Sequence, residues 1–138
     1  MKKPRAAATV GYSGTPLPKK LMIRDADVVA LVDAPKTFEK TLGALPEGAI
    51  TRRGGRGRRN VTIWFVSEAR ALERRVASVV KAAGGAKLWI AWPKKASGVV
   101  TDVSEGAVRD AGLAQGVVDI KVCAIDETWS GLLFVRRR

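Results

Sequence analysis

Short apolar runs alternate along this chain with longer segments in which apolar residues recur every three or four positions. The runs have the length and the Val, Ile and Trp content of buried strands, and they are Val28–Asp33, Val61–Val66 and Lys87–Trp92. After the second run, residues 67–83 carry one apolar stripe, with Ser67 as the expected N-cap and Gly84 as the expected C-terminal stop. This alternation predicts parallel strands that are connected by helices.

The C-terminal third predicts one more helix and a closing hairpin. Asp102, followed three residues later by Glu105, is expected to cap a helix that ends near Gly116. Two β-rich segments, Val117–Ile125 and Thr128–Val135, then face each other across a short turn. The expected fold class is therefore α/β: a three-layer, Rossmann-like, mostly parallel sheet with helices on both faces and a C-terminal antiparallel hairpin.

One α/β domain is expected over residues 15–138, because a chain of this length forms a single hydrophobic core. Residues 1–14 are expected to form a mobile basic arm. Two short helices are predicted, one over residues 16–22 and one that starts near Phe38 and ends by Pro46. Residues 51–60 contain five arginines and three glycines, and we expect an exposed loop there.

The net charge of +12 is concentrated in three segments. Residues 1–24 hold six basic side chains and no acidic one, residues 52–59 hold five arginines, and residues 136–138 hold three. The rest of the chain is nearly neutral. This distribution favours an anionic partner that contacts those segments.

Other residue counts exclude several classes of site. The chain has no histidine and a single cysteine, Cys123, which excludes Ser-His-Asp catalysis, structural zinc sites and an internal disulfide. We expect Cys123 to be a small buried hydrophobe. No apolar stretch approaches a membrane span and no secretory leader is recognisable. We therefore expect a cytoplasmic protein without membrane contact, metal or cofactor; its oligomeric state stays open.

Polar residues follow each predicted strand at its carboxyl end, the edge where ligands bind in open α/β sheets. Pro93 cannot continue the third strand, so the lysines and the serine after it fall just beyond this edge. Lysines close to helix N-termini can hold a phosphate or a carboxylate. The first hypothesis is therefore a non-enzymatic module that binds an anionic ligand at this edge through Asp33, Lys94, Lys95, Ser97, Asp126 and Trp129.

The arginine-rich segment supports a second hypothesis. Arg/Gly segments bind nucleic acid through phosphate contacts and counterion release, with little reading of sequence. The contact residues would then be Lys2, Lys3, Arg5, Arg52, Arg53, Arg56, Arg58 and Arg59.

Four blocks of the sequence carry a resemblance to a known family: GYSGTPLPKKL (11–21), VVALVDAP (28–35), WPKKASG (92–98) and VDIKVCAIDETWSGLLFV (118–135). They resemble a family of short bacterial proteins known only as a domain of unknown function, so this resemblance implies no activity. The core also looks like the second half of a class I S-adenosylmethionine (SAM)-dependent methyltransferase, in which a parallel sheet likewise ends in an antiparallel hairpin.

The chain departs from the methyltransferase pattern where such enzymes bind SAM. They have a glycine-rich turn after the first strand, whereas here no glycine follows Asp33 until Gly43. They also have an acidic residue at the end of the second strand, where this chain has the arginine segment. The resemblance thus implies a core that kept the fold and lost the cofactor site. A small transferase or hydrolase, including a degenerate methyltransferase, is the third hypothesis.

Overall fold

The computed structural model describes residues 14–54 and 56–137, so residues 1–13 of the predicted basic arm, with Lys2, Lys3 and Arg5, lie outside the described residues. A six-stranded sheet forms the centre, with the strand order β2-β1-β3-β4-β6-β5. The first four strands in this order are parallel, and β6 pairs antiparallel with both β4 and β5. The strands are β1 (Val28–Val32), β2 (Ile50–Arg53), β3 (Val61–Phe65), β4 (Lys87–Pro93), β5 (Val117–Ala124) and β6 (Trp129–Arg136).

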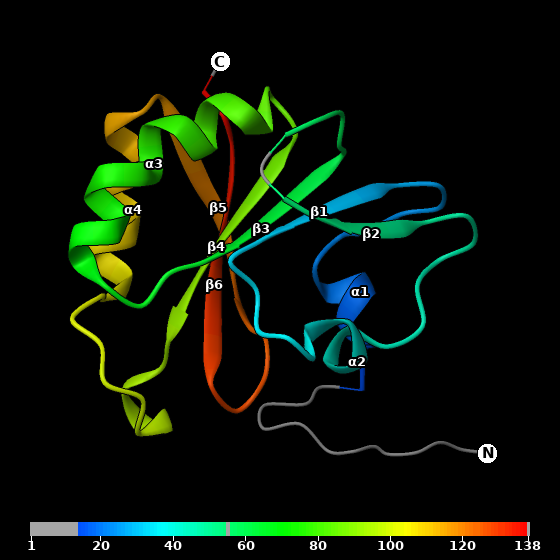
Figure 1. The fold of residues 1–138 in the computed structure, drawn as a ribbon, viewed down its shortest axis with the longest axis horizontal. Helices are drawn as coiled ribbons and strands as arrows, with labels where there is room; N and C mark the ends of the chain where they lie inside the picture. The colour runs from blue at the N-terminus through cyan, green and yellow to red at the C-terminus, as the bar shows by residue number, and fades with distance from the viewer. Residues whose placement is uncertain (1–13, 55, 138) are drawn as a thin grey trace.

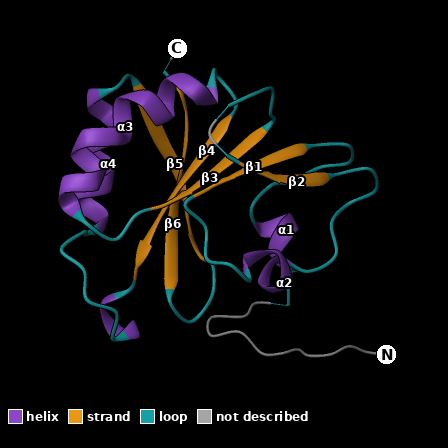
Figure 2. Ribbon diagram, in the orientation of Figure 1, coloured by secondary structure: helices purple, strands orange, loops and turns teal. Residues whose placement is uncertain are grey.

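Helices cover both faces of this sheet (Figures 1 and 2). Two short helices lie on one face and two longer helices on the other, and each pair closes its own hydrophobic core. The first pair is α1 (Leu17–Lys20) and α2 (Phe38–Leu42), and the second pair is α3 (Ala69–Ala83) and α4 (Glu105–Ala114). The α/β fold class, the mostly parallel sheet and the C-terminal antiparallel hairpin predicted from the sequence are confirmed.

The central strands are apolar throughout because they are buried on both faces. Ile63 and Phe65 of β3 contribute to the core beneath α1 and α2, whereas Trp64 points into the core beneath α3. In β4, Trp89 and Ile90 divide between the two cores in the same way. Alternate side chains of a strand face opposite sides, so both sides must be apolar here.

The helix α3 ends as predicted and begins differently. Gly84 has a φ of 58°, the left-handed conformation that commonly ends a helix. At the other end the N-cap is Glu68 rather than Ser67, and the backbone N–H of Ala69 donates to Asp102 at 2.7 Å. Asp102 therefore caps α3, and Ser104 caps α4 by accepting from Ala107 at 3.1 Å.

The structure differs from the expected exposed loop over residues 51–60 at both ends. Residues Ile50–Arg53 form the edge strand β2, which pairs in parallel with β1. None of its side chains is fully buried, so no apolar pattern is needed. The strand is held by its backbone pairing with β1 and by hydrogen bonds from its arginine side chains. At the other end, Arg59 is buried. The connection from β2 to β3 passes over β1, and its described residues hold no helix; we call residues 54 and 56–60 the crossing segment.

Candidate functional site

Two hollows lie against α3, one at its start and one along its C-terminal half, and the first lies at the carboxyl edge of the sheet. The strand order β2-β1-β3 puts the switch point, where the strand order reverses, between β1 and β3. A cavity of about 240 Å³ opens there, and we call it the edge cavity. Its lining includes Asp33 after β1, Ser67 and Glu68 after β3, and Trp129 at the start of β6.

Asp33 connects this edge cavity to the neighbouring helix. Its backbone adopts a left-handed φ of 55°, a conformation that costs an L-residue roughly 1–2 kcal/mol. Its carboxylate accepts a hydrogen bond from Trp64 Nε1 at 3.3 Å and forms an ion pair with Arg75 of α3. The Asp33 side chain is therefore held by two partners on the α3 side of the sheet.

Trp129 and Asp126 have different roles at the hairpin. The Trp129 ring packs edge-on against Phe65, with the ring centroids 5.0 Å apart, and forms a wall of the edge cavity. Asp126 instead closes the turn, because its carboxylate accepts from the backbone N–H groups of Thr128 and Trp129, each at 2.8 Å.

The basic residues predicted for the edge form a separate turn after β4. Lys94 donates its backbone N–H to Thr128 at 2.7 Å, and Ser97 Oγ donates to the Lys94 carbonyl at the same distance. Lys95 begins a single turn of 3₁₀ helix, η1 (Lys95–Ser97). The structure thus brings together Asp33 and Trp129, while Lys94, Lys95, Ser97 and Asp126 do not line the edge cavity. The two carboxylates that do line it, Asp33 and Glu68, disfavour an anion there.

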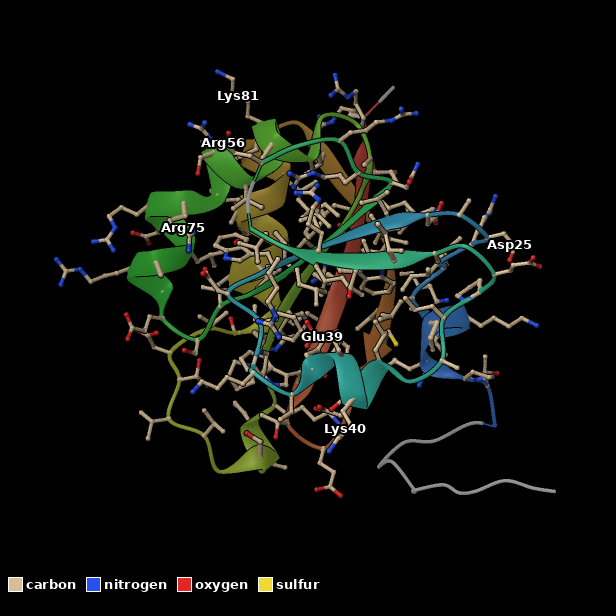
Figure 3. All side chains as sticks on the ribbon, turned by 45° about the vertical axis from the view of Figure 1, so that its right-hand side comes forward. Asp25, Glu39, Lys40, Arg56, Arg75 and Lys81 are labelled. Carbon is tan, nitrogen blue, oxygen red and sulfur yellow. The ribbon has the colours of Figure 1, made fainter. Side chains whose placement is uncertain are left out.

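The second and larger hollow lies between the crossing segment and α3, above Val32 of β1. Its volume is about 840 Å³. Four cationic side chains line it, and no described lining residue is acidic; we call it the arginine pocket. Figure 3 shows Arg56 on the crossing segment, with Arg75 and Lys81 on α3 beside it. The lining residues are Val32, Arg56, Gly57, Arg59, Arg75, Ser78, Val79, Lys81 and Ala82.

Arg59 is the most constrained of these cations. The residue is only 8% exposed, its Nε donates to the Gly57 carbonyl at 2.8 Å, and its Nη1 donates to Thr62 Oγ1 at 3.3 Å. Its Nη2 is buried and has no hydrogen-bond partner among the described residues. Burial lowers the pKa of Arg59, and the nearby charge of Arg52 lowers it further.

The other arginines of the predicted nucleic-acid contact divide into two groups. Arg52 holds the crossing segment in place by donating to the carbonyls of Arg56 and Arg58, the latter at 2.8 Å. Arg53 is likewise engaged within the protein. Arg56 and Arg58 have exposed side chains. Sequence reasoning missed Arg75, Ser78 and Lys81: their spacing predicts one polar helix face, but not what that face meets.

Arg53 fills the corner between β2 and the turn that follows β1. Its guanidinium donates to both carboxylate oxygens of Glu39 at 2.8 Å, and to the carbonyls of Ala34 at 3.0 Å and Pro35 at 2.7 Å. The hydrogen bond from Arg53 lowers the pKa of Glu39 from an ordinary 4.5 to about 2. The Arg53 side chain thus covers the turn that follows β1.

Comparisons with solved structures assign the fold. A SAM-dependent methyltransferase from Aquifex aeolicus matches with a TM-score of 0.57 at 10% identity, over 84% of this chain and 85% of that one. The magnesium protoporphyrin IX methyltransferase of Synechocystis PCC 6803, solved with bound SAH, gives 0.51 at 11% identity over 87% and 78%. A protein of the NADB-Rossmann superfamily from Streptococcus agalactiae gives 0.57 at 7% identity over 96% and 72%.

At these identities the likeness establishes the fold alone, which is the Rossmann-like fold of class I SAM-dependent methyltransferases. It spans most of the Aquifex chain, so it is not confined to the second half of such enzymes. No family model matches the sequence, and no curated protein matches it. The resemblance to the bacterial domain of unknown function therefore stays a prediction. Among the described helices, none is long and apolar enough to cross a membrane.

In this fold a nucleotide cofactor binds between the turn after β1 and the end of β2, and we call this place the cofactor corner. The residues of this chain at the cofactor corner do not fit SAM. Rossmann-type folds bind a nucleotide through a glycine-rich turn after the first strand and an acidic residue about 20 positions further on. Here the turn is Asp33-Ala34-Pro35-Lys36, and the residue 20 positions after Asp33 is Arg53. Because the Arg53 guanidinium is bonded to the carbonyls of this turn, it occupies the space above it.

Proposed function

We propose that this chain is a non-catalytic binding module on a methyltransferase-type fold, and that it binds a phosphate-bearing ligand in the arginine pocket. The observation that carries the proposal is Arg59, a buried guanidinium whose Nη2 is unpaired among the described residues, beside three further cations. The proposal keeps the anionic ligand predicted from the sequence and moves it from the edge cavity to the α3 side of the sheet.

Electrostatics favours an anion at this place. A buried charge without a counter-ion is costly, and it persists where a ligand or an ion pair compensates for it. Arg56, Arg75 and Lys81 add to the positive potential, and among the described residues only Arg75 has an acidic partner, Asp33. Guanidinium groups form short, charge-assisted hydrogen bonds to phosphate, often two in parallel.

Two features support a binding role over catalysis. The arginine pocket offers no carboxylate, thiol or imidazole among its described lining residues to act as a general base. The one hydroxyl, that of Ser78, donates to the Arg75 carbonyl at 3.0 Å. The filled cofactor corner points in the same direction, toward a degenerate relative of the methyltransferases whose fold it shares.

The proposal is tested by thermal unfolding with pyrophosphate at about 0.15 M salt. A ligand at 100 times its Kd adds about 2.7 kcal/mol to the free energy of unfolding, and this raises the Tm by several degrees. Arg59→Met should abolish the rise, because it removes the recessed donor. Arg58→Ala, a matched loss of one charge in the same segment but outside the pocket lining, should keep it.

The variant Arg59→Met is chosen because it should fold. It removes a buried charge but also the hydrogen bonds to Gly57 and Thr62, which are worth about 1 kcal/mol each, so its Tm without ligand should fall by only a few degrees. The proposal is wrong if pyrophosphate leaves the parent Tm unchanged, or if Arg59→Met responds as strongly as the parent does.

A further inference from the structure

We infer that the phosphate bound in the arginine pocket belongs to the backbone of a nucleic-acid strand, held independently of base sequence. This inference rests on the proposed function and names its ligand. It comes from three features of the pocket: the spread of its cations, the chemistry that its lining lacks, and the placement of the exposed charge around it.

The cations leave the backbone at well-separated positions around the pocket. Arg75 and Lys81 are six residues apart on α3, which is about 9 Å along a helix at 1.5 Å per residue. Arg56 faces them from the crossing segment, and Arg59 lies recessed beside Thr62. Figure 3 shows Lys81, Arg56 and Arg75 distributed along the same side of the molecule. A ligand with phosphates in succession meets several of these cations at once.

Apart from its cations, which we assign to phosphates, the described lining has no group that would read a base. It contains no aromatic ring for stacking and no side-chain amide or carboxylate for base edges, and the remaining side chains are apolar apart from Ser78. A site for a free nucleotide orients its ligand with a few placed polar groups. Phosphate contacts position a nucleic acid without carrying sequence information, and these are the contacts that this pocket offers.

Two further exposed arginines are sequence neighbours of residues that line the pocket. Arg58 is exposed next to Arg59 on the crossing segment, and Arg74 is exposed next to Arg75 on α3. The whole chain carries a net charge of +12. A positively charged surface attracts a polyanion over a distance and holds it by release of counterions.

The test is fluorescence anisotropy with labelled 15-nucleotide homopolymers of different bases, titrated at several salt concentrations. For single strands, log K falls with log[salt] with a slope of about −0.7 per phosphate contacted. Three or four engaged cations give a slope of about −2 to −3. Lys81→Ala and Arg56→Ala should each flatten the slope by about 0.7 and weaken binding several-fold for every homopolymer.

Lys40→Ala is the matched control. Lys40 lies on α2, away from the arginine pocket (Figure 3), and its loss lowers the net charge by the same amount as Lys81→Ala. Its slope and affinity should equal those of the parent. Equal losses in Lys40→Ala and Lys81→Ala would show attraction by net charge alone and would overturn the inference.

Other outcomes separate the inference from the proposed function. If pyrophosphate raises the Tm through Arg59 but the oligonucleotides do not bind, the ligand is a small phosphate compound, and only the inference is lost. Affinities that differ more than tenfold between homopolymers, or equal binding of a polyglutamate of similar length, also overturn it. If neither pyrophosphate nor oligonucleotide binds, the proposed function and the inference both fail.

Discussion

Arg53 and Arg59 lie six residues apart, and the structure uses their charges in opposite ways. Arg53 is bonded to the Glu39 carboxylate and to backbone carbonyls, so its charge is compensated within the protein. Arg59 is buried beside neutral partners, and Arg52 is the charge that acts most on it. The charge of Arg53 is therefore compensated within the protein, whereas Arg59 carries the charge that the proposed phosphate ligand would compensate.

The Arg53–Glu39 pair makes stability depend on pH in a defined window. The pKa of Glu39 falls from 4.5 to about 2 on folding, so the folded state favours the ionised carboxylate. This stabilisation is fully present above about pH 4.5 and is lost as the pH falls through about 2. The Tm advantage of the parent over Glu39→Gln should be constant from pH 7 to 5 and shrink toward pH 2. A difference independent of pH would contradict this assignment.

At the scale of elements, α4 packs against β6 at a point where only glycine fits. A Cβ at Gly112 would lie 2.2 Å from Cε1 of the Phe134 ring, and Phe134 is fully buried. Gly112→Ala should therefore lower the free energy of unfolding by about 1–3 kcal/mol. This sign is opposite to the helix propensities of the two residues, which favour alanine.

Gly106→Ala is the control in the same helix. A Cβ there would meet only Ser104 Oγ, at 4.0 Å, so propensity decides and stability should rise by up to about 1 kcal/mol. Denaturant unfolding of both variants measures the two effects. Changes of opposite sign are the expected result; stabilisation by both substitutions would show that α4 lies further from β6.

At the scale of the whole molecule, the chain has the fold of the methyltransferases but not the residues that would bind their cofactor. The six-stranded sheet matches that of SAM-dependent methyltransferases, while Arg53 occupies the corner where such a fold holds its nucleotide. Titration calorimetry with SAM should therefore detect no binding at concentrations up to about 1 mM, where a Kd of 1 mM corresponds to −4.1 kcal/mol. Arg53→Gly opens the corner without restoring the acidic residue and should also stay unbound. Saturable binding by the parent would mean that the cofactor site is retained.

The sequence by itself determined the central strands, the helix α3 with its Gly84 stop, and the closing hairpin. These follow from the spacing of apolar residues and from turn chemistry, which are local properties of the chain. It also placed Asp33 and Trp129 at the carboxyl edge of the sheet, because the carboxyl ends of parallel strands share an edge. The edge strand β2 was missed, since Ile50–Arg53 pairs through its backbone and has no apolar pattern to reveal it.

Only the tertiary structure decided how the polar side chains are used. Asp102 caps a helix that begins 33 residues earlier, and Arg75 reaches Asp33 across 42 residues of chain. Whether Arg59 is exposed or buried depends on how the crossing segment passes over the sheet, which its own composition does not specify. Periodicity records which residues are buried, but a binding site depends on which distant elements meet, and that is fixed by packing of the whole chain.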